Sequence, residues 1–119
     1  MFHINASSNT PIFEQIVLEI GKYIALDIFK ADDKLPSVRT LARDLGINPT
    51  TVTKAYSESE KIGMTFSIPG KGHFVSSKEK TLNNLIDPIY KDLDLIVQRL
   101  IKLGENKELI IEHIRKDIL

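Results

Sequence analysis

The chain has 119 residues, 42% of them hydrophobic and 27% charged, a composition typical of one folded domain or a small domain with an appendage. Its 16 basic and 16 acidic residues cancel, so the net charge indicates no particular partner. It contains no cysteine, which excludes a disulfide scaffold, a thiolate zinc site and a cysteine nucleophile. No apolar run approaches the ~20 residues that span a bilayer, and the N-terminal segment lacks the parts of a secretion signal. We therefore expect a cytoplasmic protein with no membrane partner.

The charges are distributed unevenly along the chain. Residues 12–33 carry a net charge of −3, whereas residues 34–78 carry +4. From residue 79 onward, 7 basic and 8 acidic residues nearly balance. A basic central segment in a neutral chain favours a binding face for a polyanion.

The first predicted helix begins at Thr10, a favourable N-cap residue, with Pro11 at the first helical position. Apolar residues then recur at helical spacing as far as residue 24, which predicts a wide buried stripe. The segment 31–36 interrupts this pattern and predicts a loop.

Two short helices follow the loop. Ser37 is expected to cap the first, whose apolar residues have the i, i+3, i+4, i+7 spacing, and Gly46 closes it. Asn48 is expected to cap the second, with Pro49 at the first helical position. Two short helices joined by a turn that contains glycine form a helix-turn-helix.

The next segment predicts a β-hairpin. Residues 64–68 alternate between apolar and polar, as in a strand, and residues 69–72 have the composition of a turn. Residues 73–75 then form the returning second strand. A helix, a helix-turn-helix and a hairpin in this order make a winged helix-turn-helix domain, which we assign to residues 1–78.

Residues 79–119 predict an αα-hairpin. A long amphipathic helix runs from residue 82 to 103 with Pro88 as a candidate kink, and Gly104 ends it. Asn106 is expected to cap a last helix. Two helices of this size cannot bury so many branched apolar residues, so we expect the tail to pair with a second copy. The predicted fold class is mainly α with a small β-hairpin: a winged helix-turn-helix domain and a two-helix dimerisation hairpin. The expected dimer contacts are Leu93, Ile96, Val97, Leu100, Ile101, Ile110 and Ile114.

Four blocks occur in fixed order along the chain: Pro11–Ile16, Lys34–Ala42, Asn48–Tyr56 and Gly70–Val75. Together they resemble the DNA-binding domain of GntR-family transcriptional regulators, and the short helical tail is similar to the YtrA-type subfamily. The resemblance implies a bacterial dimeric repressor that binds a palindromic operator in double-stranded DNA. The wing departs from the family pattern, because Ile68-Pro69 stands where an arginine is common before the glycine.

The resemblance and the residue chemistry together give the candidate DNA contacts. In the family an arginine at the position of Arg39 contacts guanine, which suits its planar fork; a phosphate contact or an ion pair with Asp44 is the alternative. Lys54 is expected to meet a phosphate unless it is simply solvated. The N-terminus of its helix is expected to present free N–H groups to phosphates. The glycines of the predicted hairpin turn, or wing, either allow the backbone to approach the minor groove closely or simply form an ordinary turn. The full set is Ser37, Arg39, Asn48, Pro49, Thr50, Thr51, Thr53, Lys54, Gly70, Lys71 and Gly72.

Other functional classes find less support in the sequence. The residues His3, His73 and His113 are far apart, no catalytic or metal-binding motif accompanies them, and we expect them to be solvated. We predict no enzyme activity, no cofactor and no metal. A protein-interaction module or a small-ligand-sensing winged-helix protein is the alternative. A site for an unknown small-molecule effector would have to lie at the dimer interface or between the two domains.

Overall fold

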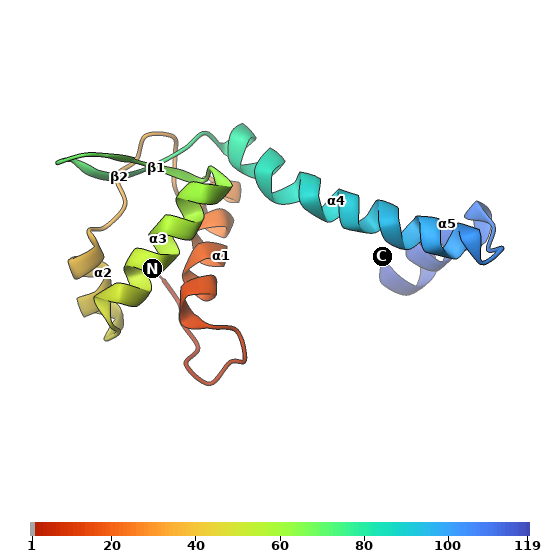
Figure 1. Ribbon diagram of the computed structural model, residues 1–119, viewed down its shortest axis with the longest axis horizontal. Coiled ribbons are helices and arrows are strands. Elements are labelled where there is room, and N and C mark those ends of the chain that lie inside the picture. Colours follow the sequence, from red (N-terminus) through yellow and green to blue (C-terminus); the bar gives the residue numbers. More distant parts are fainter. Residues whose placement is uncertain (1) are drawn as a thin grey trace. The chain divides into compact units, whose positions relative to one another are not determined.

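The computed structural model describes residues 2–119, which form two compact units. The winged-helix unit extends to Leu85, and the C-terminal unit comprises Ile86–Leu119. The predicted fold class, mainly α with one antiparallel hairpin, is confirmed (Figure 1). The elements in chain order are α1 (Ile12–Ala25), α2 (Val38–Leu45), α3 (Pro49–Ile62), β1 (Thr65–Ile68), β2 (Gly72–Val75), α4 (Lys78–Lys102), α5 (Lys107–His113) and the π-helical turn η1 (Ile114–Ile118).

The start of α1 differs from the prediction, because Thr10 does not cap it. Pro11 occupies the cap position, and no side chain caps the helix there. The side-chain amide of Gln15 instead forms hydrogen bonds to the segment that precedes the helix. Its Nε2 donates to the carbonyls of Asn5 and Thr10, each over 2.9 Å, and its Oε1 accepts from the Asn5 N–H over 2.7 Å.

The helix-turn-helix is held by the predicted caps. The Oγ of Ser37 accepts from the N–H of Thr40 over 3.1 Å, and the Oδ1 of Asn48 accepts from the N–H of Thr50 over 2.8 Å. Gly46 ends α2 in the left-handed conformation, with φ of +65°. Both caps and the turn are therefore as the sequence indicated.

The core of the winged-helix unit lies where the three helices meet the hairpin. α1 contributes its isoleucine stripe, α3 its buried face, and the hairpin covers one end. Each such large apolar side chain contributes about 1.5–3 kcal/mol when buried. Phe2 and Phe29 enclose Tyr23 edge to face, with ring centroids 5.5 and 5.4 Å from the tyrosine ring. The least exposed apolar residues are Ile16, Ile20, Ile24, Leu35, Val52, Ala55, Tyr56, Met64 and Val75.

The predicted hairpin is present, and of its polar strand residues Thr65 is buried whereas Ser67 is exposed. Thr65 pairs with Val75 in register, and both are buried. On the other face Phe66 stacks on Phe74 with their centroids 5.7 Å apart, and both rings stay half-buried. His73 is not solvated as predicted: it packs against the ring of Tyr56, centroid to centroid 4.9 Å.

The first two turns of α4 belong to the winged-helix unit. Thr81 is fully buried, and Leu85 packs on the core of this unit. The ammonium of Lys78 forms an ion pair with Asp27 over 3.1 Å. Residues that follow the wing therefore stabilise the winged helix itself.

The C-terminal unit buries little of its apolar surface within one chain. α4 runs through Pro88 as one helix, and Asn106 caps α5 as predicted, accepting from the N–H of Leu109 over 2.9 Å. The last predicted helix is divided, because α5 ends at His113 and passes into η1. Ile110 is the buried residue among those described in this unit, at 8% exposed. The exposed large apolar side chains are Ile86, Ile89, Tyr90, Leu93, Leu95, Ile96, Leu100, Ile101, Leu103, Leu109, Ile111, Ile118 and Leu119.

Candidate nucleic-acid interface

Helix α3 buries one face and leaves the opposite face open. Val52, Ala55, Tyr56 and Ser59 point into the core. Because the helical period is 3.6 residues, the side chains on the other side share one outer face. That face consists of Thr50, Thr53, Lys54 and Ser57, all of which are exposed. Three short hydroxyl side chains and one cation on an open helix form a surface suited to the major groove of DNA.

The N-terminal end of α3 is electrostatically positive but offers few free donors. The N–H of Thr50 bonds to the side chain of Asn48, the N–H of Thr51 bonds to the Asn48 carbonyl over 3.0 Å, and Pro49 has no N–H. The expectation of free N–H groups there is therefore wrong. The first turns of α2 and α3 carry no acidic residue, so the helix dipole and the side chains remain to attract phosphate.

Helix α2 places two arginines beside the start of α3. Arg39 and Arg43 line a shallow hollow together with Pro49. Asp44 pairs with Arg43, Nε to Oδ1 over 3.8 Å, rather than with Arg39 as the alternative prediction held. Both side chains of that pair are more than 60% exposed, so it contributes little to stability. Sequence reasoning missed Arg43, although its position one turn after Arg39 places both on one face.

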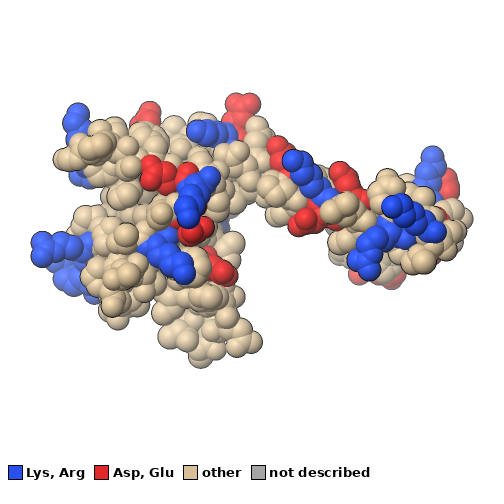
Figure 2. Space-filling view, viewed as in Figure 1, with Lys and Arg blue, Asp and Glu red and all other residues tan. Residues whose placement is uncertain are grey.

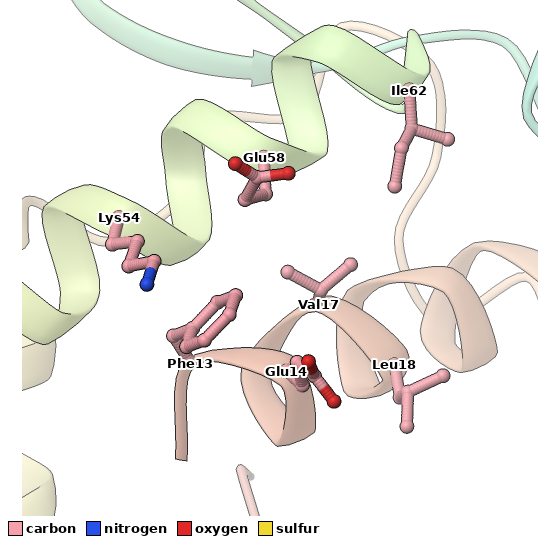
Figure 3. Close-up of a pocket in the computed structure, with 7 residues that line it drawn as sticks. All are labelled: Phe13, Glu14, Val17, Leu18, Lys54, Glu58 and Ile62. Atoms are coloured by element: carbon pink, nitrogen blue, oxygen red, sulfur yellow. The ribbon is translucent and has the colours of Figure 1, made fainter. Parts of the chain in front are cut away.

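Lys54 lies at the edge of the outer face of α3, on the side nearest to α1. Its Nζ stands 4.0 Å from the centroid of the Phe13 ring. Figure 3 shows Phe13 at the start of α1 beneath Lys54, at one end of a groove between the two helices. Glu14 and Glu58 line the same groove, which is otherwise apolar. The groove belongs entirely to the winged-helix unit.

The wing, formed by β1, β2 and the residues between them, ends in an exposed turn. The N–H of Lys71 donates to the Ile68 carbonyl over 2.9 Å, and Gly70 has φ of +76°. Proline followed by glycine with positive φ matches a type II turn. Gly72 follows with φ of +124°, and a Cβ there would meet the Lys34 side chain at 3.0 Å. The Lys34 side chain thus lies beside Gly72, which follows the exposed Lys71 at the tip of the wing.

Basic side chains gather on the same part of the winged-helix unit. On the face seen in Figure 2, Lys and Arg lie over α2, over α3 and beside the tip of the hairpin, whereas acidic groups lie over α1 and next to the basic groups on the C-terminal half of α3. The +4 segment of the sequence is therefore also a local surface feature. Ser37, another predicted contact, uses its Oγ to cap α2 and to donate to Thr40 Oγ1 over 2.8 Å.

The described residues 2–119 offer no group of three or more His, Asp or Glu side chains that could hold a metal ion. Over the same range, no helix combines the length and the apolarity that crossing a membrane requires.

Comparison with known proteins agrees with this geometry. The profile of the bacterial regulatory proteins, gntR family, matches residues 12–75, from α1 through β2. The HTH-type transcriptional repressor YtrA of Bacillus subtilis (strain 168) is 43% identical over 81 residues, which cover 68% of this chain and 62% of that repressor. These relatives are transcriptional regulators, a class of protein distinct from enzymes.

Solved structures extend the similarity to the C-terminal unit. A transcriptional regulator from Oenococcus oeni has a TM-score of 0.71 and 34% identity, with 97% of each chain covered. The DNA-binding domain of AraR, solved in complex with operator ORE1, has a TM-score of 0.55 and 25% identity, covering 64% of this chain and 93% of that domain. The family profile spans every element of the interface described above, and the chain accordingly belongs to the gntR family of bacterial regulatory proteins, among its YtrA-like members.

Proposed function

We propose that this protein is a transcriptional repressor that binds a palindromic operator in double-stranded DNA as a homodimer. The observation that carries the proposal is the open outer face of α3, whose first half is free of acidic residues and flanked by Arg39 and Arg43. Two relatives support it, since YtrA is a repressor and the AraR domain was solved with its operator.

Within this function each basic residue has its own task. Arg39 has the planar, five-donor fork that pairs with the O6 and N7 of guanine in the major groove. Lys54 is a point charge on the flank of α3 and suits a backbone phosphate. Lys71 at the wing tip supplies charge beside the minor groove, where the neighbouring glycines permit close approach. Thr50 and Thr53 reach base edges or a thymine methyl group.

The C-terminal unit supplies the dimer in this proposal. Leu93, Ile96, Leu100 and Ile101 are each 37–52% exposed within one chain. An apolar surface of this extent favours association with a copy of itself. Val97 and Ile114 are half-buried at the margins, whereas Ile110 already packs inside its own chain. A two-fold axis through such a pair would present two α3 helices to half-sites about 34 Å apart, which requires a palindrome.

Binding to duplex DNA at several salt concentrations tests the proposal. A site enriched from random duplexes supplies the operator. If a dimer neutralises ~6–10 phosphates, its affinity should fall by roughly 10³–10⁵ between 50 and 200 mM salt. The operator should also bind far more tightly than a scrambled duplex at physiological salt. A flat salt profile, or equal affinity for both duplexes, would instead favour a protein-interaction module.

A further inference from the structure

We propose that Phe13 is a positioning residue for DNA binding, which holds the ammonium group of Lys54 where a backbone phosphate arrives. This inference rests on the proposed function, because the phosphate belongs to the operator complex. Phe13 lies at the start of α1, outside the helix-turn-helix, and nothing in the DNA-contact set predicted from the sequence includes it.

The geometry is that of a cation–π contact. The Nζ of Lys54 stands 4.0 Å from the centroid of the Phe13 ring (Figure 3). The face of an aromatic ring carries a partial negative charge and attracts a cation within about 6 Å of its centroid. A lysine side chain on an open helix face otherwise samples many rotamers, and ordering it opposes binding. The ring therefore removes part of that cost before DNA arrives.

The ring holds the ammonium without neutralising it. Two carboxylates, Glu14 and Glu58, line the same groove, yet among the described residues neither forms an ion pair with Lys54. Glu58 pairs with Lys61 over 3.3 Å instead. A lysine four residues before a glutamate is also the less favourable order for an ion pair on a helix. The positive charge of Lys54 thus stays available for a phosphate.

A double-mutant cycle on the full chain tests the pair. Phe13→Leu keeps the apolar bulk but removes the π face, and should weaken operator binding about two- to fivefold per subunit, in keeping with a cation–π contact at an exposed site. It should leave the salt dependence nearly unchanged. Lys54→Met should lower the salt slope by about one per subunit. In the double variant, Phe13→Leu should have no additional effect, since the ring then has no cation to hold.

Two further variants separate positioning from packing. Phe13→Tyr keeps the π face and should bind the operator like the original chain. Val17→Ala removes apolar packing in the same groove without touching the cation, so its effect should add to that of Lys54→Met. If Phe13→Leu also adds fully to Lys54→Met, Phe13 acts only through packing and the inference is overturned.

A measurement without DNA keeps this outcome distinct from failure of the proposed function. The ring current of Phe13 should shift the Lys54 side-chain NMR resonances upfield, and Phe13→Leu should remove the shift. A shift that is absent in the original chain overturns the positioning role. Failure of the salt and operator tests, by contrast, would overturn the proposed function itself.

Discussion

The hydroxyl of Tyr56 in α3 donates to the carbonyl of Pro36, in the loop before α2, over 2.7 Å. This bond crosses the helix-turn-helix on its inner side, where Tyr56 is 1% exposed. It fixes the start of α2, which carries Arg39, against the middle of α3. The bond therefore couples the stability of the unit to the spacing of α2 and α3.

Tyr56→Phe should destabilise the protein by about 1 kcal/mol, because the partly buried Pro36 carbonyl loses its donor while the ring still fills its place. Urea unfolding measures the change through its midpoint. The slope of the transition should stay constant, as expected for a change that leaves the folded surface intact. A midpoint equal to that of the original chain would show that water replaces the hydroxyl.

Stability should decline in alkaline solution because two tyrosines are buried. Burial, followed by the hydrogen bond and charge of Glu19, raises the pKa of Tyr23 to about 12, and burial raises the pKa of Tyr56 as well. An unfolded tyrosine has a pKa of about 10. The native state therefore retains protons that the unfolded state releases, so this stabilisation is complete below pH ~10 and is lost between about 10 and 12.

The direct check is the free energy of unfolding at several pH values for the original chain and for Tyr23→Phe. The substitution should flatten the decline above pH ~10, since phenylalanine has no proton to lose. Comparing the two chains removes the contribution of the lysines, which titrate in the same range. Parallel curves for the two chains would contradict the assignment of the decline to Tyr23.

Gly72→Ala should distort the wing more than Gly70→Ala. Gly70 has φ of +76° in open space, where an alanine costs about 1–2 kcal/mol. Gly72 has φ of +124°, outside the left-handed helical region, and its new Cβ would also press on Lys34 at 3.0 Å. Thermal unfolding and the amide spectra of residues 65–75 report the difference. Equal effects at both positions would show that the hairpin adjusts without strain.

Arg39→Ala and Arg43→Ala should differ in kind. Loss of the guanine contact proposed for Arg39 should cost about 1–3 kcal/mol and relax the preference at one base pair in each half-site. Arg43 lies one helical turn further on and should serve the backbone, so its loss should weaken all duplexes alike and reduce the salt slope. A base-substitution scan of the operator distinguishes them, and identical scans would mean that these roles are wrongly assigned.

Ile96→Asp should convert the proposed dimer to a monomer, because it places a charge in the apolar surface of the C-terminal unit. Sedimentation at micromolar concentration measures the mass. Leu18→Asp is the matched control, since Leu18 is similarly exposed (66% against 52%) but lies in the winged-helix unit. A mass of one chain for the unmodified protein would exclude the dimer at this concentration. A point substitution is preferable to truncation after Lys78, which would remove Thr81 and Leu85 from the core.

The sequence predicted features that depend on residues close together in the chain, such as the helix caps. Ser37 and Asn48 cap their helices through hydrogen bonds to residues two or three positions away, so residue type and spacing were enough to predict them. At the start of α1, Pro11 rather than Thr10 occupies the cap position, and the Gln15 side chain binds the carbonyls of Thr10 and Asn5. Two competing local solutions existed there, and residue type alone did not choose between them.

Contacts between distant residues could not be predicted. The burial of Thr65 in the hairpin depends on how the strands pack on the rest of the unit, and alternation along the strand does not reveal that packing. His73 packs on Tyr56, 17 positions earlier, and Lys54 lies over Phe13, 41 positions earlier. These contacts form only when the helices and the hairpin pack together. One of them, Lys54 over Phe13, lies at the candidate interface.

The enclosed ring of Tyr23 has a practical consequence for spectroscopy. The protein contains no tryptophan and three tyrosines, so its ultraviolet fluorescence comes from tyrosine. Tyr23 and Tyr56 report on the winged-helix unit, whereas Tyr90, 61% exposed on α4, reports on the C-terminal unit. Phe substitutions at the two buried positions would leave Tyr90 as the sole emitter. Optical melting could then follow the two units separately in an otherwise unlabelled chain.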